Sequence, residues 1–248
     1  MIATIVALSL RATLGRRRTL LLALLAGVPV LLALLLRLGG TTEDPIGGPD
    51  SLATNIVNQL MVRTVLPLIA LVLGTGVLGS ELEDGTAVYL LTKPVPRWQI
   101  VLGKAIVAVG VSALFVAPAT VLTVVLLGSA ANLGPLGFGL TVAAIVGAGV
   151  YAVGFLALSL ITTRAFIVGL IYTIVWEGAL AGLFEGTSLL SVRQYTLGIE
   201  DGLTGGLARS TESVLAPGPA AIGATVALVV AFAIATLELS RSEIRAAD

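Results

Sequence analysis

Six long apolar runs constrain this chain more than any other feature of its sequence. A bilayer core about 30 Å thick is crossed by about 20 residues of α-helix, and the runs cover residues 20–38, 60–78, 100–127, 136–161, 165–184 and 219–239. Hydrophobic residues make up 57% of the chain and charged residues only 11%, far outside the range of water-soluble domains. The sequence therefore predicts an all-α polytopic membrane protein with six transmembrane helices, forming a single domain over residues 1–248.

The third run is the longest, and as a straight helix it would measure about 42 Å. It must therefore tilt, kink at Pro118 or extend beyond the lipid.

The basic residues predict how the six spans are oriented. With both termini on one side, ten of the fourteen Lys and Arg residues fall on that side, and only Arg37, Arg63, Arg193 and Arg209 fall on the other. Because basic residues are enriched on the cytoplasmic side, both termini are predicted to be inside, in a cytoplasmic (inner or plasma) membrane.

Two segments outside the spans are predicted to form helices of their own. Residues 1–18 are apolar up to a cluster of arginines and predict an interfacial helix, or alternatively a helical extension of the first span. A cleaved signal peptide is disfavoured, because the apolar run after the arginines is longer than usual and no convincing cleavage site follows it. The external segment 185–217 is too polar to span and predicts one or two short helices on the outer surface.

Several classes of function are excluded by residues and motifs that the sequence lacks. The chain has no His and no Cys, so only a metal site built from carboxylates alone is left open. Its net charge is zero, and without a basic block it is not expected to bind nucleic acid. It contains neither a phosphate-binding loop, Gly-x-x-x-x-Gly-Lys-Ser/Thr, nor a hydrolase motif. It is therefore predicted not to be an enzyme by itself.

A charged segment between the second and third runs, residues 80–104, stands out and is called the island below. It opens with three acidic residues, which favour a helix N-terminus by roughly 0.3–1 kcal/mol each. Gly85 then permits a turn, and Pro94 and Pro96 stop the short apolar helix that follows. An ordinary capped loop would explain the acids and the glycine, but not the run that continues to Lys104.

The island resembles the first cytoplasmic loop of type 2 ABC permeases, the membrane subunits of ATP-binding-cassette exporters that have a separate ATPase chain. This branch includes the permeases of nitrous-oxide-reductase maturation. The resemblance is carried by Glu81, Glu83, Asp84, Gly85, Thr86, Tyr89, Leu90, Lys93, Pro94, Pro96 and Arg97, and it extends through Trp98 to Gly103 and Lys104.

The resemblance implies that residues 80–99 carry a coupling helix that fits into a cleft of the ATPase subunit. It implies two ATPase copies, which hold ATP and Mg²⁺, whereas this chain has no cofactor of its own. It also implies a second permease chain, identical or related, in contact with the surrounding lipid. An external accessory protein is a further possible partner.

The fifth run contains Glu177, the one clear carboxylate within a span, followed by Gly178 and Gly182. The glycine pair predicts close helix packing, either with a second permease chain, as the resemblance implies, or within the protomer. A carboxylate at this depth must be neutral, paired or wet, with Arg63 and Arg193 as possible partners. Glu177 is predicted either to line the outer exit of a pathway or to form a structural ion pair with Arg63.

The leading hypothesis is a permease subunit of an ABC transporter, of the exporting kind, that works as a dimer. The predicted interior is apolar with scattered hydroxyls, which suits an apolar or amphiphilic cargo; these are Ser112, Thr120, Thr123, Thr141 and Ser159. One alternative is a non-transporting subunit that relays ATPase motion to an external partner. An ion-coupled carrier fits less well, because such carriers use several carboxylates at membrane depth.

Overall fold

The computed structural model describes residues 6–7, 9–10, 13, 16–40, 48–83, 96–180, 185–208 and 215–247. Within these ranges the backbone is helical apart from short connections, and no β-strand occurs. The all-α prediction is therefore confirmed for the described chain. Residues 84–95 of the island and most of the first fifteen residues lie outside it.

Five helices of the described chain are long and apolar enough to cross a membrane. They are α2 (Arg16–Leu38), the continuous helix of α3 (Gly48–Ile56), η1 (Val57–Val65) and α4 (Leu66–Glu83), then α6 (Arg97–Leu127), α7 (Leu133–Ile161) and α10 (Pro217–Ala247). Their lengths follow from the apolar runs, as predicted, and α6 continues through Pro118. These five helices make the chain a multi-pass membrane protein.

The fifth predicted span is described from Ala165 to Leu180, and its last four residues lie outside the described chain. The described part consists of α8 (Ala165–Ile171), which continues as the π-helix η2 (Tyr172–Leu180). At 1.5 Å per residue, residues 165–180 rise about 24 Å, less than the core of about 30 Å. Six full-length spans are therefore not found among the described residues.

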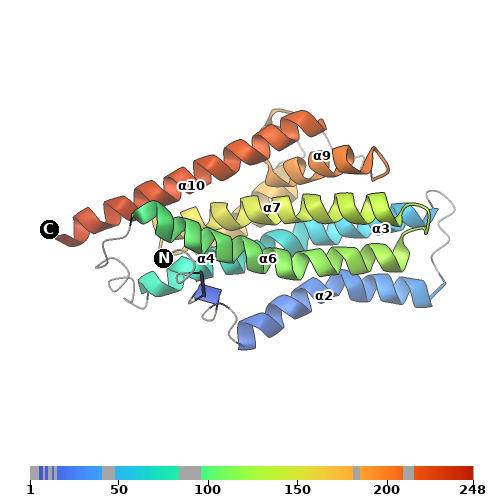
Figure 1. Cartoon of the computed structure of the whole chain (residues 1–248), viewed down its shortest axis with the longest axis horizontal. Helices are drawn as coiled ribbons and strands as arrows, with labels where there is room; N and C mark the ends of the chain where they lie inside the picture. Colours follow the sequence, from blue (N-terminus) through green and yellow to red (C-terminus); the bar gives the residue numbers. More distant parts are fainter. Residues whose placement is uncertain are drawn as a thin grey trace.

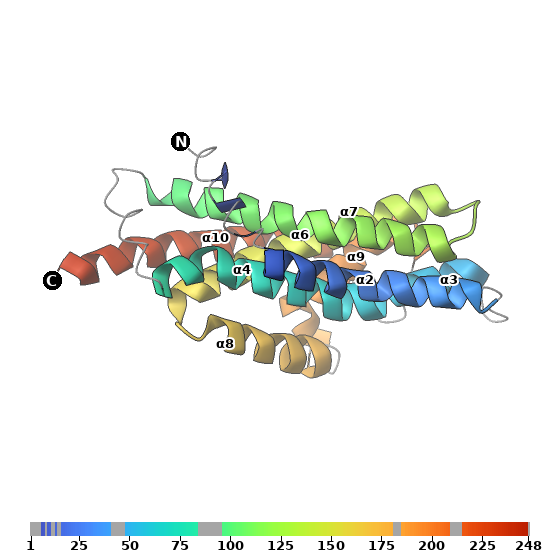
Figure 2. The same ribbon diagram turned by 90° about the horizontal axis from the view of Figure 1, so that it is seen from below.

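Helix α7 lies at the centre of the bundle. Helices α4, α6 and α10 pack along it, together with the shorter α9 (Val192–Thr204), while α2 lies against α6 (Figure 1). Helix α8 lies beside α4 at the edge of the bundle (Figure 2). In the most apolar part of each helix, 67% of the residues of α7 are buried, against 22% in α2 and 17% in α10. The two peripheral helices thus leave broad apolar faces uncovered, as membrane helices do.

The polar helix α9 is packed between α7 and α10 instead of lying on the surface of the bundle (Figure 1). Glycines in the first half of α7 make room for it, because a Cβ at Gly147 would collide with Thr196 and one at Gly139 with Thr204. On its other side, a Cβ at Gly198 would come within 2.6 Å of Ala220 of α10. The prediction of short helices in this segment is confirmed; α9 is packed between two long helices, and its place on the outer side of the membrane stays a prediction.

The contacts of α9 also show the relative directions of α7, α9 and α10. Helix α9 runs antiparallel to α7, and it runs antiparallel to α10 as well, because Gly202 meets Pro217 whereas Tyr195 meets Gly223. Helices α7 and α10 are therefore parallel. The chain must pass from one end of the bundle to the other between Ile161 and Pro217. Helix α8–η2 begins this passage, and α9 continues it at the end of the bundle where α7 starts.

The described parts of residues 1–15 touch the bundle. Val6 and Leu10 pack against its main apolar core, and Ser9 and Thr13 are buried, with Thr13 Oγ1 donating to the Ser9 carbonyl at 2.7 Å. One side of the predicted interfacial segment therefore contacts protein.

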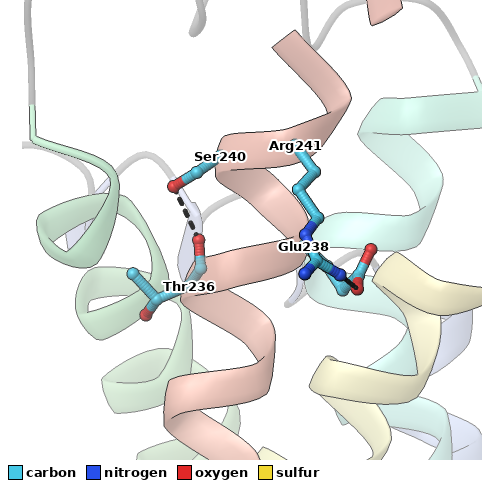
Figure 3. A network of polar contacts seen from close by, with 4 residues as sticks. All are labelled: Thr236, Glu238, Ser240 and Arg241. Atoms are coloured by element: carbon cyan, nitrogen blue, oxygen red, sulfur yellow. Dashed lines mark hydrogen bonds and ion pairs between the residues drawn. The ribbon is translucent and has the colours of Figure 1, made fainter. Parts of the chain in front are cut away.

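The last turns of α10 carry a partly exposed polar network (Figure 3). Arg241 Nη1 lies 3.1 Å from Glu238 Oε1, and Ser240 Oγ donates to the Thr236 carbonyl at 2.8 Å. Because the Arg241 side chain is 70% exposed, this pair stabilises the helix only weakly.

Candidate functional site

The two ends of the island are helical, and they belong to α4 and α6. Glu81 and Glu83 form the last turn of α4, and Pro96 directly precedes Arg97, the first residue of α6. Glu81 and Glu83 therefore end one helix, and the short helix that they are predicted to precede lies outside the described residues. The predicted site residues Asp84, Gly85, Thr86, Tyr89, Leu90, Lys93 and Pro94 lie outside the described residues.

Two residues of the island motif near the start of α6 differ in their exposure to solvent. Trp98 is 46% exposed in the first turn, whereas Lys104, which closes the island motif, is only 1% exposed. A lysine can bury its long stem, but its ammonium then needs a polar neighbour. The Lys104 side chain is thus buried within the helix bundle, which its position in the sequence did not indicate.

A second candidate site surrounds Glu177, which lies on η2 and is 2% exposed. Its carboxylate accepts three hydrogen bonds: Tyr172 Oη at 3.0 Å, Ser191 Oγ at 2.6 Å and the Val192 backbone N–H at 2.9 Å. Three donors satisfy most of the acceptor capacity of a carboxylate. The buried position predicted for Glu177 is thus compatible with its polarity without a cation in direct contact.

The donors around Glu177 converge because α9 begins there. Ser191 is the N-cap of α9, and its hydroxyl accepts from the Gln194 N–H at 3.2 Å while it donates to Glu177. The positive end of the α9 dipole therefore faces the carboxylate, an arrangement that favours a negative charge. Glu177 joins η2 to α9 at the point where the two parts of the passage from α7 to α10 meet.

Arg63 does not form the predicted ion pair with Glu177 in the described chain. Its guanidinium donates to the neighbouring Gly178 carbonyl at 2.9 Å and to Gln59 Oε1 at 3.2 Å. The reason is that Glu177 points to the start of α9, whereas Arg63 reaches the backbone of η2. Arg193, the other predicted partner, is 6% exposed. Burial and the charge of Arg63 lower the pKa of Arg193, and the nearby Glu177 opposes that shift.

Of the two glycines in the fifth run, the structure describes only Gly178. A Cβ on Gly178 would meet no other helix, because its nearest atom within 4 Å is the Thr173 carbonyl of the same helix. Gly178 is therefore not used for close helix packing within the described protomer. Gly182 lies outside the described residues.

The hydroxyls predicted to line the interior are mostly bonded within their own helices. Ser112, Thr120 and Thr123 are buried and donate to the carbonyls four residues earlier. Ser159 also donates within α7, but it lines a cavity of about 630 Å³ next to the α7–α8 connection. This cavity combines apolar walls, hydroxyl groups and two guanidinium groups, those of Arg18 and Arg164.

The fold is that of a polytopic helical membrane protein with a charged segment between its second and third long helices. A comparison with protein families matches residues 14–180 to the ABC-2 family transporter protein model. The match covers about two thirds of the chain, and it includes the island and the Glu177 helix. This chain belongs to the ABC-2 transporter family. No curated protein matches it.

Membership of this family makes the chain an ABC-type permease, the membrane component of a transporter and not the catalytic one. Permeases of this family normally work with an ATPase subunit. The resemblance of the island to a permease loop is thereby confirmed at the level of the family. The match ends before α9, whose first turn binds Glu177, and before α10, which closes the bundle.

Proposed function

We propose that this chain is the permease subunit of an ABC exporter, in which two permease chains form the membrane part and two ATPase subunits dock on residues 80–99. The observation that carries the proposal is the family match across that loop. Long helices leave both ends of the loop, and both α4 and α6 pack on the central α7. A push on the loop would therefore move helices of the core.

In this proposal both termini and the loop face the cytoplasm, and the chain crosses the membrane six times. Five crossings are the long helices. The sixth includes α8–η2, because the parallel arrangement of α7 and α10 requires one more passage, and α9 continues from it at the outer end of the bundle. Glu177 lies where η2 and α9 meet, so a change in its contacts would separate them.

The cavity beside the α7–α8 connection supports an amphiphilic cargo with an anionic headgroup. Arg18 and Arg164 supply positive charge, and Thr75 and Thr163 are nearby hydroxyl residues. Apolar residues such as Phe166 complete the wall. An arginine guanidinium binds phosphate or carboxylate groups well, and the apolar wall suits an acyl chain.

Docking is tested by changing the loop while leaving the helices intact. Gly85→Pro, or Glu83→Lys combined with Asp84→Lys, should abolish copurification of the cognate ABC ATPase or its stimulation by the permease. Glu238→Lys is the matched charge reversal on α10 and should keep both. If the ATPase stays bound and fully stimulated in both loop variants, residues 80–99 are not its docking site.

Export is tested separately with the whole complex in liposomes. A fluorescent anionic phospholipid should move between leaflets only when ATP is hydrolysed, and Arg18→Gln with Arg164→Gln should slow that movement. ATP hydrolysis that continues without movement of this lipid or of other amphiphiles would instead favour a subunit that relays motion to an external partner.

A further inference from the structure

A buried acid–amide contact joins two elements that are far apart in the sequence. Asn58 Nδ2, on η1, donates to Glu200 Oε1, on α9, at 3.0 Å. The two residues are 3% and 1% exposed, and neither belongs to the sites predicted from the sequence. Glu200 is therefore a buried titratable group that the proposed function does not use.

One oxygen of each side chain has no hydrogen-bond partner in the described chain. These atoms are Asn58 Oδ1 and Glu200 Oε2, and both are buried. Each is an acceptor if Glu200 is ionised, so neither can satisfy the other. Buried polar atoms are almost always hydrogen-bonded, and an ionised carboxylate needs more support than a single amide donor gives.

We propose that Glu200 is a proton-binding site, with the proton held on Oε2 and directed towards Asn58 Oδ1. A carboxylic acid and an amide carry complementary pairs of one donor and one acceptor. The bond from Asn58 Nδ2 to Glu200 Oε1 is the first half of such a pair, and the bound proton supplies the second. One proton taken from solvent thus satisfies both orphaned oxygens, and no other group changes.

The electrostatic surroundings agree with this assignment. Burial raises the pKa of Glu200 to about 8, the charge of Asp201 adds to the rise, and the hydrogen bond from Asn58 opposes it. In the described chain, the other ionisable groups near α9 gather at its opposite end, around Glu177; they are Arg63 of η1, Tyr151 of α7, Tyr172 of η2, and Arg193 and Tyr195 of α9. On α10, Glu238 and Arg241 lie near the far end of the helix. The side chain of Glu185 on η3 lies outside the described residues.

Proton binding is linked to the contact between η1 and α9. The pKa of Glu200 is about 8 in the folded chain and 4.5 for an ordinary carboxyl group. The folded state therefore holds the proton more tightly, and stability falls as pH rises from about 4.5 to about 8. Each pH unit in this window raises the unfolding constant about tenfold relative to a chain without the titrating group.

The proton can be detected by infrared spectroscopy of the full chain in lipid nanodiscs. Protonated carboxyl groups have a separate C=O stretching band. The difference spectrum between wild type and Glu200→Gln at about pH 6 should contain this band, and it should disappear with a midpoint of about pH 8. The introduced glutamine keeps an amide pair with Asn58 but cannot titrate. The absence of the band, or a midpoint near the ordinary value, would overturn the proposal.

Three further variants isolate the residue and the pairing. Glu238→Gln is the matched change at a partly exposed carboxyl group and should leave the band unchanged, as should Asp201→Asn. Asn58→Ala should shift the band to higher frequency, because the Glu200 carbonyl loses its donor. If Asp201→Asn removes the band, the proton is on Asp201. If Asn58→Ala leaves the frequency unchanged, the pair does not form. Either result contradicts the proposal.

Discussion

At the scale of single residues, two buried carboxyl groups hold α9 in two different ways. Glu177 accepts three donors at the start of the helix, so both of its oxygens are hydrogen-bonded. Glu200 meets one donor and retains an unpartnered oxygen, so its environment suits a neutral acid. The difference comes from the helix dipole and from the number of donors, since both side chains are almost fully buried.

The variant Glu177→Gln tests the first of these environments. An amide presents an N–H₂ group where three donors converge, so at least one buried donor loses its acceptor, at a loss of about 1–3 kcal/mol in folding free energy. We expect a clearly lower thermal midpoint in detergent, whereas Glu238→Gln, at a partly exposed position, should change stability by less than about 1 kcal/mol. Equal midpoints for Glu177→Gln and wild type would show that the three hydrogen bonds do not hold α9.

The variant Ser191→Ala tests the same contact from the other side. It removes the N-cap of α9 and one donor to Glu177, and loss of an N-cap alone costs about 0.5–2 kcal/mol. Ser191→Thr should retain most of the stability, because it keeps the hydroxyl group. A matching loss in Ser191→Thr would mean that size, and not the hydroxyl, matters at this position.

At the scale of elements, the passage from α7 to α10 explains what the sequence could and could not predict. The long spans were predictable, because an apolar run of about 20 residues matches the thickness of the bilayer core. The position of α9 was not, since its polar composition suggested a surface helix. The available signal was the set of small residues at matching positions, with Gly139 and Gly147 on α7 facing Thr204 and Thr196 on α9.

At the site around Glu177, the carboxylate itself could be predicted from the sequence, but its hydrogen-bond partners could not. A carboxylate within an apolar run marks a functional or structural site without any knowledge of the fold. Its partners Ser191 and Val192 lie beyond a segment that no periodic pattern connects to the run. Glu200 could not be recognised at all, because it becomes buried only when α9 enters the bundle.

Glycine substitutions on α7 test the insertion of α9. In Gly147→Ala the added methyl group collides with Thr196, and overpacking of this kind typically costs about 1–3 kcal/mol. Gly154→Ala, on the same helix, meets no atom within 4 Å and should be neutral or slightly stabilising. The thermal midpoints of the two variants measure the difference. Equal effects would contradict the close packing of α9 on α7.

At the scale of the whole molecule, α8–η2 has an apolar face that the other described helices do not cover. Helix α8–η2 carries Ile167, Ile171 and Ile174 at spacings of three and four residues, and they are 56%, 56% and 61% exposed. The row leads to Gly178, where an added Cβ would meet no other helix of the described chain. Lipid can cover isoleucines, but a glycine at the end of such a row allows two helices to approach closely. This combination supports the proposed second permease chain.

The absence of cysteine from the sequence makes this face directly testable in native membranes. Ile174→Cys should form an intermolecular disulfide on mild oxidation, because a second copy would bring the Cα atoms to within about 7 Å. Val229→Cys is the control, since Val229 is 58% exposed on the uncovered face of α10 and has no such glycine beside it. We expect dimers on denaturing gels for the first variant only. Equal crosslinking of both variants would indicate random collision, and no crosslinking of Ile174→Cys would place the partner chain elsewhere.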